Sequence, residues 1–554
     1  MEAILIHNMA PIMFMALVVF LLLGYPAAFS LGAVGLLFGL VGIELNLFQP
    51  DFMRALPERV YGVMSNDTLL AIPFFTFMGL ILERSGMAED LLETIGQLFG
   101  TVRGGLAYAV VFVGALLAAT TGVVAASVIS MGLISLPIML RYGYDRQVAS
   151  GVIAASGTLA QIIPPSLVLI VMADQLGRSV GDMYEGAFIP GIVLAGLYAA
   201  YVFLVTIFFP KAAPGLPIEA IGFREADGGR GLNSLLVLAI ASAVFGWLMM
   251  RNSAARGADF VVFGMFWGIV FAFSIAVINW ASEKTIGFRF LSHIAQQTTF
   301  VMVPPLFLIF LVLGTIFIGV ATPTEGGAMG ASGALILGFA KRRLRWDLIR
   351  QAVHSTAKLS AFVLFILIGA RVFSLTFYGV SGHIWVEELL VSLPGGQIGF
   401  LLFVNAFVFV LAFFLDFFEL AFIIIPLLGP SAEKLGIDLI WFGVILGVNM
   451  QTSFMHPPFG FALFYLRSVA PREPYLDRVT GARMEPVTTG QIYWGAVPFV
   501  FIQVIMVVLV IMFPGMVMHY KGVGTGVDPS KVRIDIPQIE LPPMIDFNQP
   551  PKIN

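Results

Sequence analysis

Two matching apolar segments, 293 residues apart in this chain, are each interrupted by two adjacent prolines. The first copy, 152–166, contains Pro164-Pro165, and the second, 444–459, contains Pro457-Pro458. Proline removes a backbone donor and clashes with the preceding turn, so each copy is expected to unwind inside a membrane. Unpaired carbonyl groups at that depth are tolerated only where they line a cavity or bind something. Two interrupted helices at matching places in two halves of a chain therefore indicate the binding site of a transporter.

The composition is that of a helical membrane protein. Hydrophobic residues make up 59% of the chain and charged residues 11%, whereas about 25% of the residues of a soluble domain are charged. Apolar stretches of about 20 residues recur, which predicts an all-α polytopic fold. The absence of cysteine excludes disulfides, iron–sulfur clusters and thiol catalysis, and the six histidines lack metal-ligand spacing. We expect no catalytic residues, no transition-metal site and no nucleic-acid partner.

Ten apolar stretches are expected to cross the membrane completely: 9–24, 26–44, 68–83, 186–209, 233–250, 259–280, 300–320, 323–340, 356–376 and 491–518. The two broken helices are expected at 147–173 and 439–466. Two further stretches, 104–140 and 398–430, are predicted to be re-entrant hairpins. The first has no charged residue from Gly105 to Leu140, and a loop between two full spans is normally more polar. Two complete spans remain the alternative for that stretch.

The distribution of cations predicts the orientation in the membrane. If the N-terminus lies outside, 19 of the 30 Lys and Arg residues fall in inward-facing segments and 10 in outward-facing ones. The densest block is 341–345, with four cations in five residues. The positive-inside rule favours this arrangement. Both termini are then predicted to lie on the periplasmic side.

The internal repeat extends beyond the prolines and sets the predicted domain organisation. The segment 69–79 matches 359–369 at an offset of 290 residues. Because the predicted topology brings matched segments in from opposite sides, we expect two inverted repeats. The predicted units are a first repeat at 1–215, an inserted segment with two extra transmembrane helices at 216–295, a second repeat at 296–520, and a proline-rich polar tail at 521–554.

Polar residues gather at the expected hairpin tips and helix breaks. Backbone carbonyls, hydroxyls and half-helix ends at such places can surround an ion without the burial of many full charges. The candidates in the first half are Thr120, Thr121 and Gly122 at the hairpin tip, and Ser156, Gly157, Thr158, Pro164, Pro165 and Ser166 in the broken helix. Those in the second half are Asp416 at the hairpin, and Asn449, Gln451, Thr452, Ser453, Pro457 and Pro458 in the broken helix. The alternative for each hydroxyl is a hydrogen bond to its own helix.

Arg371 and Asp416 lie within apolar stretches. A charge at the centre of a membrane helix costs about 2.5–3.5 kcal/mol on insertion scales, so such residues usually face a cavity or a partner. Two interpretations are open. Arg371 and Asp416 form an ion pair that fixes the second hairpin, or Arg371 contacts the anionic group of a substrate.

Several segments resemble the large membrane subunit of tripartite ATP-independent periplasmic (TRAP) transporters. They are 71–75 with Gly79 and Ser85-Gly86, Gly143-Tyr-Asp145, Gly157-Thr158 with 163–166, and Thr322-Pro-Thr-Glu325. The resemblance covers both halves of the chain. The two inserted helices exceed the usual plan and resemble a longer subclass. The second half also has His456-Pro-Pro-Phe459 where the first has Ile-Pro-Pro-Ser, so its site is expected to differ chemically.

The resemblance implies a secondary transporter that imports a small organic acid, a carboxylate, across the bacterial inner membrane. It implies sodium as the coupling ion at both hairpin–helix junctions, no other cofactor, and an elevator mechanism. The implied partners are a separate small four-helix membrane subunit, a periplasmic substrate-binding protein and membrane lipid.

Two other functions remain as alternatives. A stand-alone sodium-coupled carboxylate carrier would have the same repeat logic without a binding protein. An intramembrane enzyme or redox subunit is disfavoured, because the chain has no cysteine and no Gly-x-Ser-x-Gly or Walker-type loop.

Overall fold

The computed structural model describes Ile6 and residues 8–222, 225, 229, 231–253, 258–457, 460–477 and 479–519. The polar tail predicted at 521–554 lies outside them. Within this part of the chain, eight helices are long and apolar enough to cross a membrane, or up to ten if each of two bent pairs counts as one span. The predicted all-α polytopic fold is confirmed.

The first half contains ten helices among its described residues, in the order α2 (Met9–Leu22), α3 (Ala27–Glu44), α4 (Leu56–Met64), α5 (Ala71–Arg84), α6 (Met87–Phe99), α7 (Gly105–Thr121), α8 (Val124–Arg141), α9 (Arg146–Thr158), α10 (Leu167–Gln175) and α11 (Val180–Phe208). Short 3-10 segments are η1 (Pro50–Ala55), η2 (Asp67–Leu70), η3 (Leu159–Gln161) and η4 (Ile218–Ala220). The inserted segment forms α12 (Leu232–Met250) and α13 (Ala258–Ile286).

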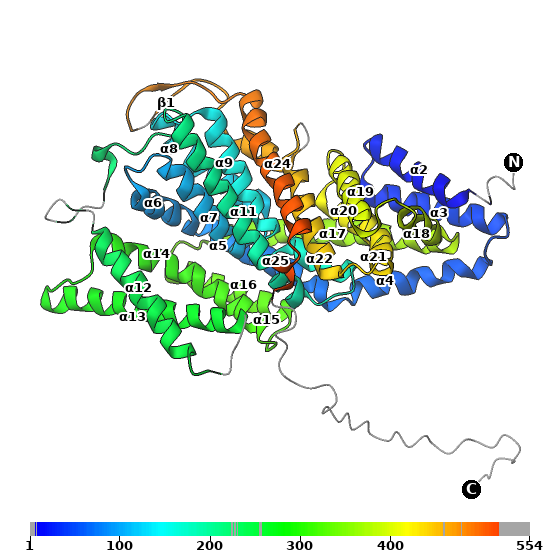
Figure 1. Cartoon of the computed structure of the whole chain (residues 1–554), viewed down its shortest axis with the longest axis horizontal. Coiled ribbons are helices and arrows are strands. Elements are labelled where there is room, and N and C mark those ends of the chain that lie inside the picture. Colours follow the sequence, from blue (N-terminus) through cyan, green and yellow to red (C-terminus); the bar gives the residue numbers. More distant parts are fainter. Residues whose placement is uncertain are drawn as a thin grey trace, which may run out of the picture.

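The second half begins with α14 (His293–Ile309), a π-helical turn η5 (Phe310–Gly314), α15 (Thr315–Phe317), α16 (Pro323–Ala340) and α17 (Trp346–Gly379). It continues with α18 (Gly382–Val391), α19 (Gly396–Leu411), α20 (Phe417–Ile423), α21 (Ile425–Lys434), α22 (Leu439–Met450), the 3-10 segment η6 (Gln451–Phe454), α23 (Phe461–Val469), α24 (Thr489–Met512) and α25 (Gly515–Met518). An antiparallel pair, β1 (Tyr475–Leu476) and β2 (Arg483–Met484), lies between α23 and α24. Figure 1 shows α24 between a group with α6 to α9 and a group with α2, α3 and α18 to α21.

Three helices occupy segments that the sequence analysis left as loops. They are α4, α6 and α18. All three are short and carry charges, so a search for long apolar stretches passes over them. Helix α4 continues with η2 into α5 with a bend of 44°, and α18 leads into α19 with a bend of 117°.

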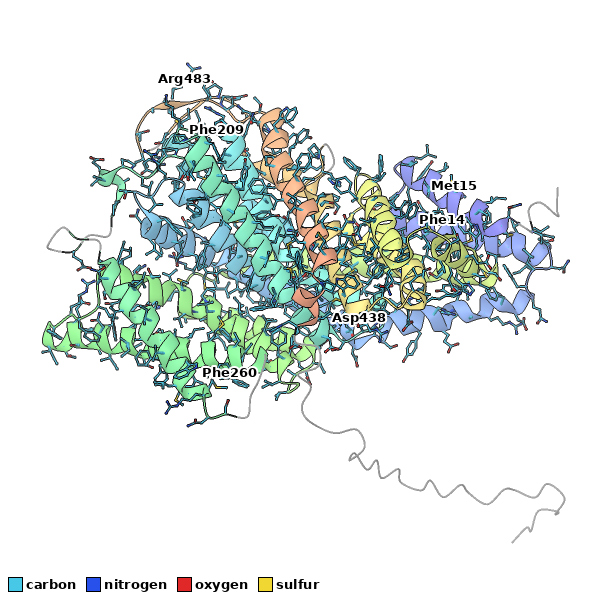
Figure 2. The ribbon with its side chains drawn as sticks, in the orientation of Figure 1. Phe14, Met15, Phe209, Phe260, Asp438 and Arg483 are labelled. Atoms are coloured by element: carbon cyan, nitrogen blue, oxygen red, sulfur yellow. The ribbon has the colours of Figure 1, made fainter. Side chains whose placement is uncertain are left out.

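Polar contacts at or near the ends of helices fall into two groups that follow the predicted sides. The contacts among segments predicted to face inward include Asp90 with Lys341 at 2.8 Å and with Arg343 at 2.9 Å, and Arg141 with Asp477 at 2.9 Å. Those among segments predicted to face outward include Arg178 with Glu433 at 3.0 Å and Asn66 with Asp174 at 2.7 Å. Figure 2 likewise shows Phe209 and Arg483 near one edge, and Asp438 and Phe260 toward the other. Which group faces the cytoplasm remains a prediction from the charges.

The loop with the β-hairpin holds the base of α8. Asp477 accepts hydrogen bonds from the Arg141 guanidinium at 3.0 Å, and from the backbone and hydroxyl of Thr480 at 2.8 and 2.7 Å. The Arg141 guanidinium holds the pKa of the Asp477 carboxyl well below its usual range. Asp477 therefore anchors the C-terminal end of α8, which is the second arm of the predicted first hairpin.

The inserted helices cross closely, and a buried amide of α13 helps to attach them to the second half. A Cβ atom on Gly246 of α12 would lie 2.1 Å from the carbonyl oxygen of Gly264 on α13, so only glycine allows this crossing. Asn279 of α13 is fully buried and donates to Gln296 Oε1 of α14 at 2.5 Å. Its Oδ1 accepts from the backbone N–H groups of Phe290 and Leu291, both at 2.9 Å.

Replacing Asn279 with leucine should loosen this attachment. The nearly isosteric side chain leaves two backbone N–H groups and one amide without partners, and each buried unsatisfied group costs about 1–3 kcal/mol. We expect the hydrogen–deuterium exchange of 287–292 to rise by at least about tenfold, since 1.4 kcal/mol corresponds to a factor of about ten. The matched control is Ser274→Ala on the same helix, whose hydroxyl bonds only the Val270 carbonyl of α13. Unchanged exchange in the Asn279 variant would contradict the assignment.

Candidate functional site

The first broken helix is interrupted where its prolines predict. Helix α9 passes into η3 after Thr158, and α10 begins only at Leu167. The peptide bond between Pro164 and Pro165 is cis. Ser166 closes the break, because its hydroxyl donates to the Gln161 carbonyl at 2.6 Å and accepts from the Leu169 N–H at 3.4 Å.

The second broken helix has the same order of elements. Helix α22 passes into η6 at Gln451, and α23 begins at Phe461. Pro457 lies in the interruption, and Pro458 lies outside the described residues. Each half therefore supplies one helix end on either side of an unwound segment.

The tip of the first hairpin lies against the first break. Helices α7 and α8 are joined at Gly122, which has a φ of +58° that favours glycine. A Cβ atom on Gly122 would lie 3.4 Å from the carbonyl oxygen of Pro165. The side chains of Thr120 and Thr121 lie outside the part of the chain that the structure describes. Because α8 alone is long and apolar enough to cross a membrane, the re-entrant hairpin and the two complete spans both remain predictions for this stretch.

The tip of the second hairpin is organised by hydrogen bonds of Asp416 and Asn449. Asp416 caps α20, because its Oδ1 accepts from the Glu419 N–H at 2.8 Å and its own N–H donates to Glu419 Oε2 at 2.9 Å. Asn449 bonds the arm of the hairpin: its Nδ2 donates to the carbonyl and Oδ1 of Asn405 on α19, at 2.8 and 2.9 Å. Sequence reasoning missed Asn405, which lies inside an apolar helix without a neighbouring break.

The polar side chains at the breaks divide into two classes. Some hydroxyls bond their own chain, as the alternative interpretation predicts: Thr158 donates to Ala155 O at 2.8 Å, and Thr452 to Asn449 O at 2.7 Å. Other buried oxygens have no hydrogen-bond partner among the described residues. They are Ser156 Oγ, Gln161 Oε1, Gln451 Oε1 and Ser453 Oγ. Buried polar atoms without partners are rare, so these four are the candidates for ion ligands.

Glycine has a steric role beside these oxygens. A Cβ atom on Gly157 would lie 2.3 Å from Val128 Cγ2 on α8. The absence of a side chain at Gly157 therefore lets the second arm of the hairpin reach the end of α9.

The two breaks are in direct contact. Gln451 Nε2 donates to Thr158 Oγ1 at 3.0 Å, and these residues are 293 positions apart, the offset that relates the two proline pairs. Gln503 of α24 adds a second link, because its Nε2 donates to Tyr198 OH of α11 at 2.9 Å and lies 3.5 Å from Thr158 Oγ1. All four residues are buried. Gln503 and Tyr198 were missed, since both lie in long apolar helices.

A cavity of about 580 Å³ joins these parts, and we call it the central cavity. Its wall includes Gly122 of the first tip, Gln161 of the first break and Asp416 of the second tip. Phe454 of η6 brings in the second break. The remaining wall is formed by residues of α5, α8, α10, α17, α20 and α23. The structure thus gathers both hairpins and both broken helices around one space.

Two cations that the sequence analysis did not select line the central cavity. They are Arg84 at the end of α5 and Lys358 of α17. Arg84 donates to Gln351, whereas Lys358 is exposed and has no ion pair or hydrogen bond among the described residues. The two carboxylates in the wall already have donors: Glu83 bonds Ser130, and Asp416 bonds the backbone of α20. These donors are neutral and leave the carboxylate charges in place, so Arg84 and Lys358 are the cations of the wall that a bound carboxylate could contact.

Arg371 does not line the central cavity. It lines a separate cavity of about 410 Å³ together with Arg59 and Asp174. Asp416 belongs to the central cavity, and no ion pair joins Arg371 to Asp416 in the described ranges. The ion-pair interpretation is therefore wrong for this structure.

Comparison with known proteins gives the family. The model of the family described as "Tripartite ATP-independent periplasmic transporter, DctM component" matches residues 14–516. The chain belongs to this family. It is a large permease subunit of a TRAP transporter, a transport protein with many membrane helices.

The relatives are permeases named for different organic anions. The chain is 29% identical to the C4-dicarboxylate TRAP transporter large permease protein DctM of Pseudomonas aeruginosa, over 78% of this chain and 84% of that one. It is 22% identical to the sialic acid TRAP transporter permease protein SiaT of Haemophilus influenzae, over 90% and 67%. Among solved structures, it is similar to the Alcanivorax borkumensis YdaH transporter, with a TM-score of 0.49 and 14% identity over 85% of this chain and 90% of that one.

Proposed function

We propose that this large permease subunit imports a small carboxylate across the bacterial inner membrane and couples the import to sodium. The central cavity carries the proposal, because it unites two hairpin tips, two helix breaks and two cations in one space. Each sodium ion that moves inward across 100 mV adds about 2.3 kcal/mol of driving force beyond its concentration gradient.

The proposed coupling to sodium rests on the buried oxygen atoms at the two helix breaks. Sodium needs several oxygen ligands, and the breaks offer buried oxygens without partners in Ser156, Gln161, Gln451 and Ser453. The unwound segments add backbone carbonyls and helix ends. We place one ion at each junction of a hairpin with a broken helix, with the tip residues Thr120 and Thr121 in the first site. We expect no other cofactor.

The proposed carboxylate substrate is supported by the two cations in the wall of the central cavity. Arg84 and Lys358 can contact the carboxylate groups of an organic acid from the same wall. Relatives named for C4-dicarboxylates, sialic acid and isethionate support an organic anion as the cargo of this chain. The proposed cargo is a small carboxylate.

We propose a separate small four-helix membrane subunit and a periplasmic substrate-binding protein as partners, because the family name describes a tripartite transporter. One relative, the isethionate permease protein DctMQ of Oleidesulfovibrio alaskensis, covers more than this chain, which spans 60% of its length at 24% identity. The inverted repeats, the elevator movement and the periplasmic termini belong to the same proposal. The hydrogen bond between Thr158 and Gln451 at the repeat offset supports a two-fold relation of the halves.

Replacing Ser156 with alanine should raise the sodium concentration that gives half-maximal uptake by about three- to tenfold. The side chain is fully buried, and the change removes an oxygen that has no other partner among the described residues. A neutral ligand contributes about 0.5–1.5 kcal/mol. Thr299→Ala is the control, since its hydroxyl bonds the Ala295 carbonyl of its own helix at 2.8 Å. An unchanged sodium dependence for Ser156→Ala would remove this residue from the site.

The function as a whole is tested by succinate-stimulated sodium flux in proteoliposomes. The full chain is reconstituted with its small subunit, with and without the binding protein. We expect flux only in the presence of all three components and a sodium gradient. Flux that persists without the binding protein and small subunit would instead support the stand-alone carrier. Uptake without dependence on sodium would contradict the coupling.

A further inference from the structure

A second cavity lies beside the central one, along the same long helix. Its volume is about 410 Å³, and we call it the second cavity. Residues of α4, α10, α17, α20 and α21 line it, together with the residues between α10 and α11 and the first residue of α22. It includes Arg59 of α4 and Arg371 of α17.

The wall of the second cavity contains two arginines, Arg59 and Arg371, and two carboxylates, Asp174 and Glu433. Asp174 accepts hydrogen bonds from Asn66 and Gln175, both at 2.7 Å. Glu433 is bonded by Arg178 at 3.0 Å. Glu433 is therefore neutralised by Arg178, whereas Asp174 keeps its charge beside two neutral amides. Neither Arg59 nor Arg371 has an ion pair or side-chain hydrogen bond within the described ranges, so the arginines around the cavity outnumber the carboxylates. Arg371 is half-buried in a membrane helix, where an unpaired cation normally faces a partner or a pathway.

Helix α17 forms a wall of both cavities. Ser355, Lys358 and Phe362 line the central cavity, and Arg371 and Ser374 line the second one. Lys358 and Arg371 are thirteen positions apart, or about 20 Å at a rise of about 1.5 Å per residue. One helix therefore presents an unpaired cation to each cavity.

The short helix α20 separates the two spaces. Phe417 and Phe418 face the central cavity, and Phe422 faces the second one. The ring of Phe418 lies 6.4 Å from that of Phe362 on α17 and 6.3 Å from that of Phe422, measured between centroids. This aromatic contact therefore lies between residues that line the two cavities.

We propose that the second cavity is a binding site for an organic carboxylate, held by Arg371 with Arg59. Arg371 supplies a planar pair of donors that suits a carboxylate, and Arg59 supplies the second charge. This inference rests on the proposed function, because it assigns the same class of substrate to the second cavity.

The test uses the natural absence of cysteine from the chain. Single variants Ser374→Cys and Ser355→Cys place one thiol in the second and in the central cavity, respectively. The full chain in lipid nanodiscs is labelled with a water-soluble maleimide, with succinate as the probe. Succinamide, which has the same length and no charge, is the control ligand. We expect succinate, but not succinamide, to slow the labelling of both thiols by about fivefold or more.

Further variants separate local binding from a distant effect. In Arg371→Gln/Ser374→Cys, protection of the thiol by succinate should be lost. In Lys358→Gln/Ser374→Cys it should remain, since Lys358 lies in the other cavity. The inference is overturned if Ser374→Cys does not react at all, if succinate fails to protect it while protecting Ser355→Cys, or if the Arg371 change leaves protection intact. Loss of protection at both thiols would instead contradict the carboxylate substrate of the proposed function.

Discussion

Replacing Lys358 with glutamine should raise the substrate concentration for half-maximal uptake by about 10- to 150-fold. Lys358 is the cation of the central cavity that has no partner among the described residues, so its charge is available to a bound carboxylate. A hydrogen bond to a charged group contributes about 1.5–3 kcal/mol, and 1.4 kcal/mol corresponds to a factor of ten in affinity. The measurement is succinate uptake by the reconstituted transporter over a range of concentrations.

The same helix provides the control for Lys358. Arg350 lies eight residues earlier on α17 and is exposed, and it does not line the central cavity. Arg350→Gln removes the same charge from the same helix and should change the half-maximal concentration by less than about twofold. Equal effects of the two variants would show that Lys358 acts through the general field of α17 and not through contact with the substrate.

Replacing Gly151 with alanine should destabilise the protein by about 1–3 kcal/mol or more, the range for overpacking of a tight interior. The added Cβ atom would lie 2.1 Å from the carbonyl oxygen of Gly495, and a Cβ on Gly495 would lie 2.2 Å from that of Gln147. These atoms belong to backbones, so the first half of the broken helix α9 would have to move away from α24. Because α24 also carries Gln503, the bond network at Thr158 would be disturbed with it.

The melting temperature of the purified chain, followed by size-exclusion chromatography after heating, measures this effect. Gly196→Ala in α11 is the matched control, since a Cβ there meets no atom within 4 Å. Alanine at an open helical position should be neutral or stabilising by up to about 1 kcal/mol. A melting temperature of Gly151→Ala equal to that of Gly196→Ala would contradict the close crossing.

Local chemistry in the sequence was enough to predict much of the fold. The paired prolines at matching positions of the two halves located both helix breaks, since proline removes a backbone donor and disfavours a continuous helix. A proline pair alone was not sufficient, because Pro304 and Pro305 lie inside the continuous helix α14. The apolar stretches predicted the long spans such as α11 and α17. The charged short helices α4, α6 and α18 were not predicted, since their stability depends on packing against neighbouring helices and not on a long apolar stretch.

The candidate site was predicted less completely. The polar residues at the breaks were found because they stand out from apolar surroundings, yet Ser166 and Thr452 use their hydroxyls locally. Lys358 was missed, since a cation near the end of an apolar stretch is normal at a membrane surface. The available signal was spacing: Lys358 lies three residues after Ser355 and four before Phe362, so the three side chains share one face of α17. Which cavity holds Arg371 depends on the packing of distant helices, and no local pattern encodes that.

The pair α12 and α13 has a practical consequence for imaging this transporter. No residue of the pair lines the central cavity, and among described residues its closest polar attachment runs through Asn279 and the start of α14. A rigid fiducial protein fused between the two helices would therefore not obstruct the central cavity. Such a fusion would add a recognisable domain to a particle that is otherwise surrounded by lipid. It should leave uptake intact.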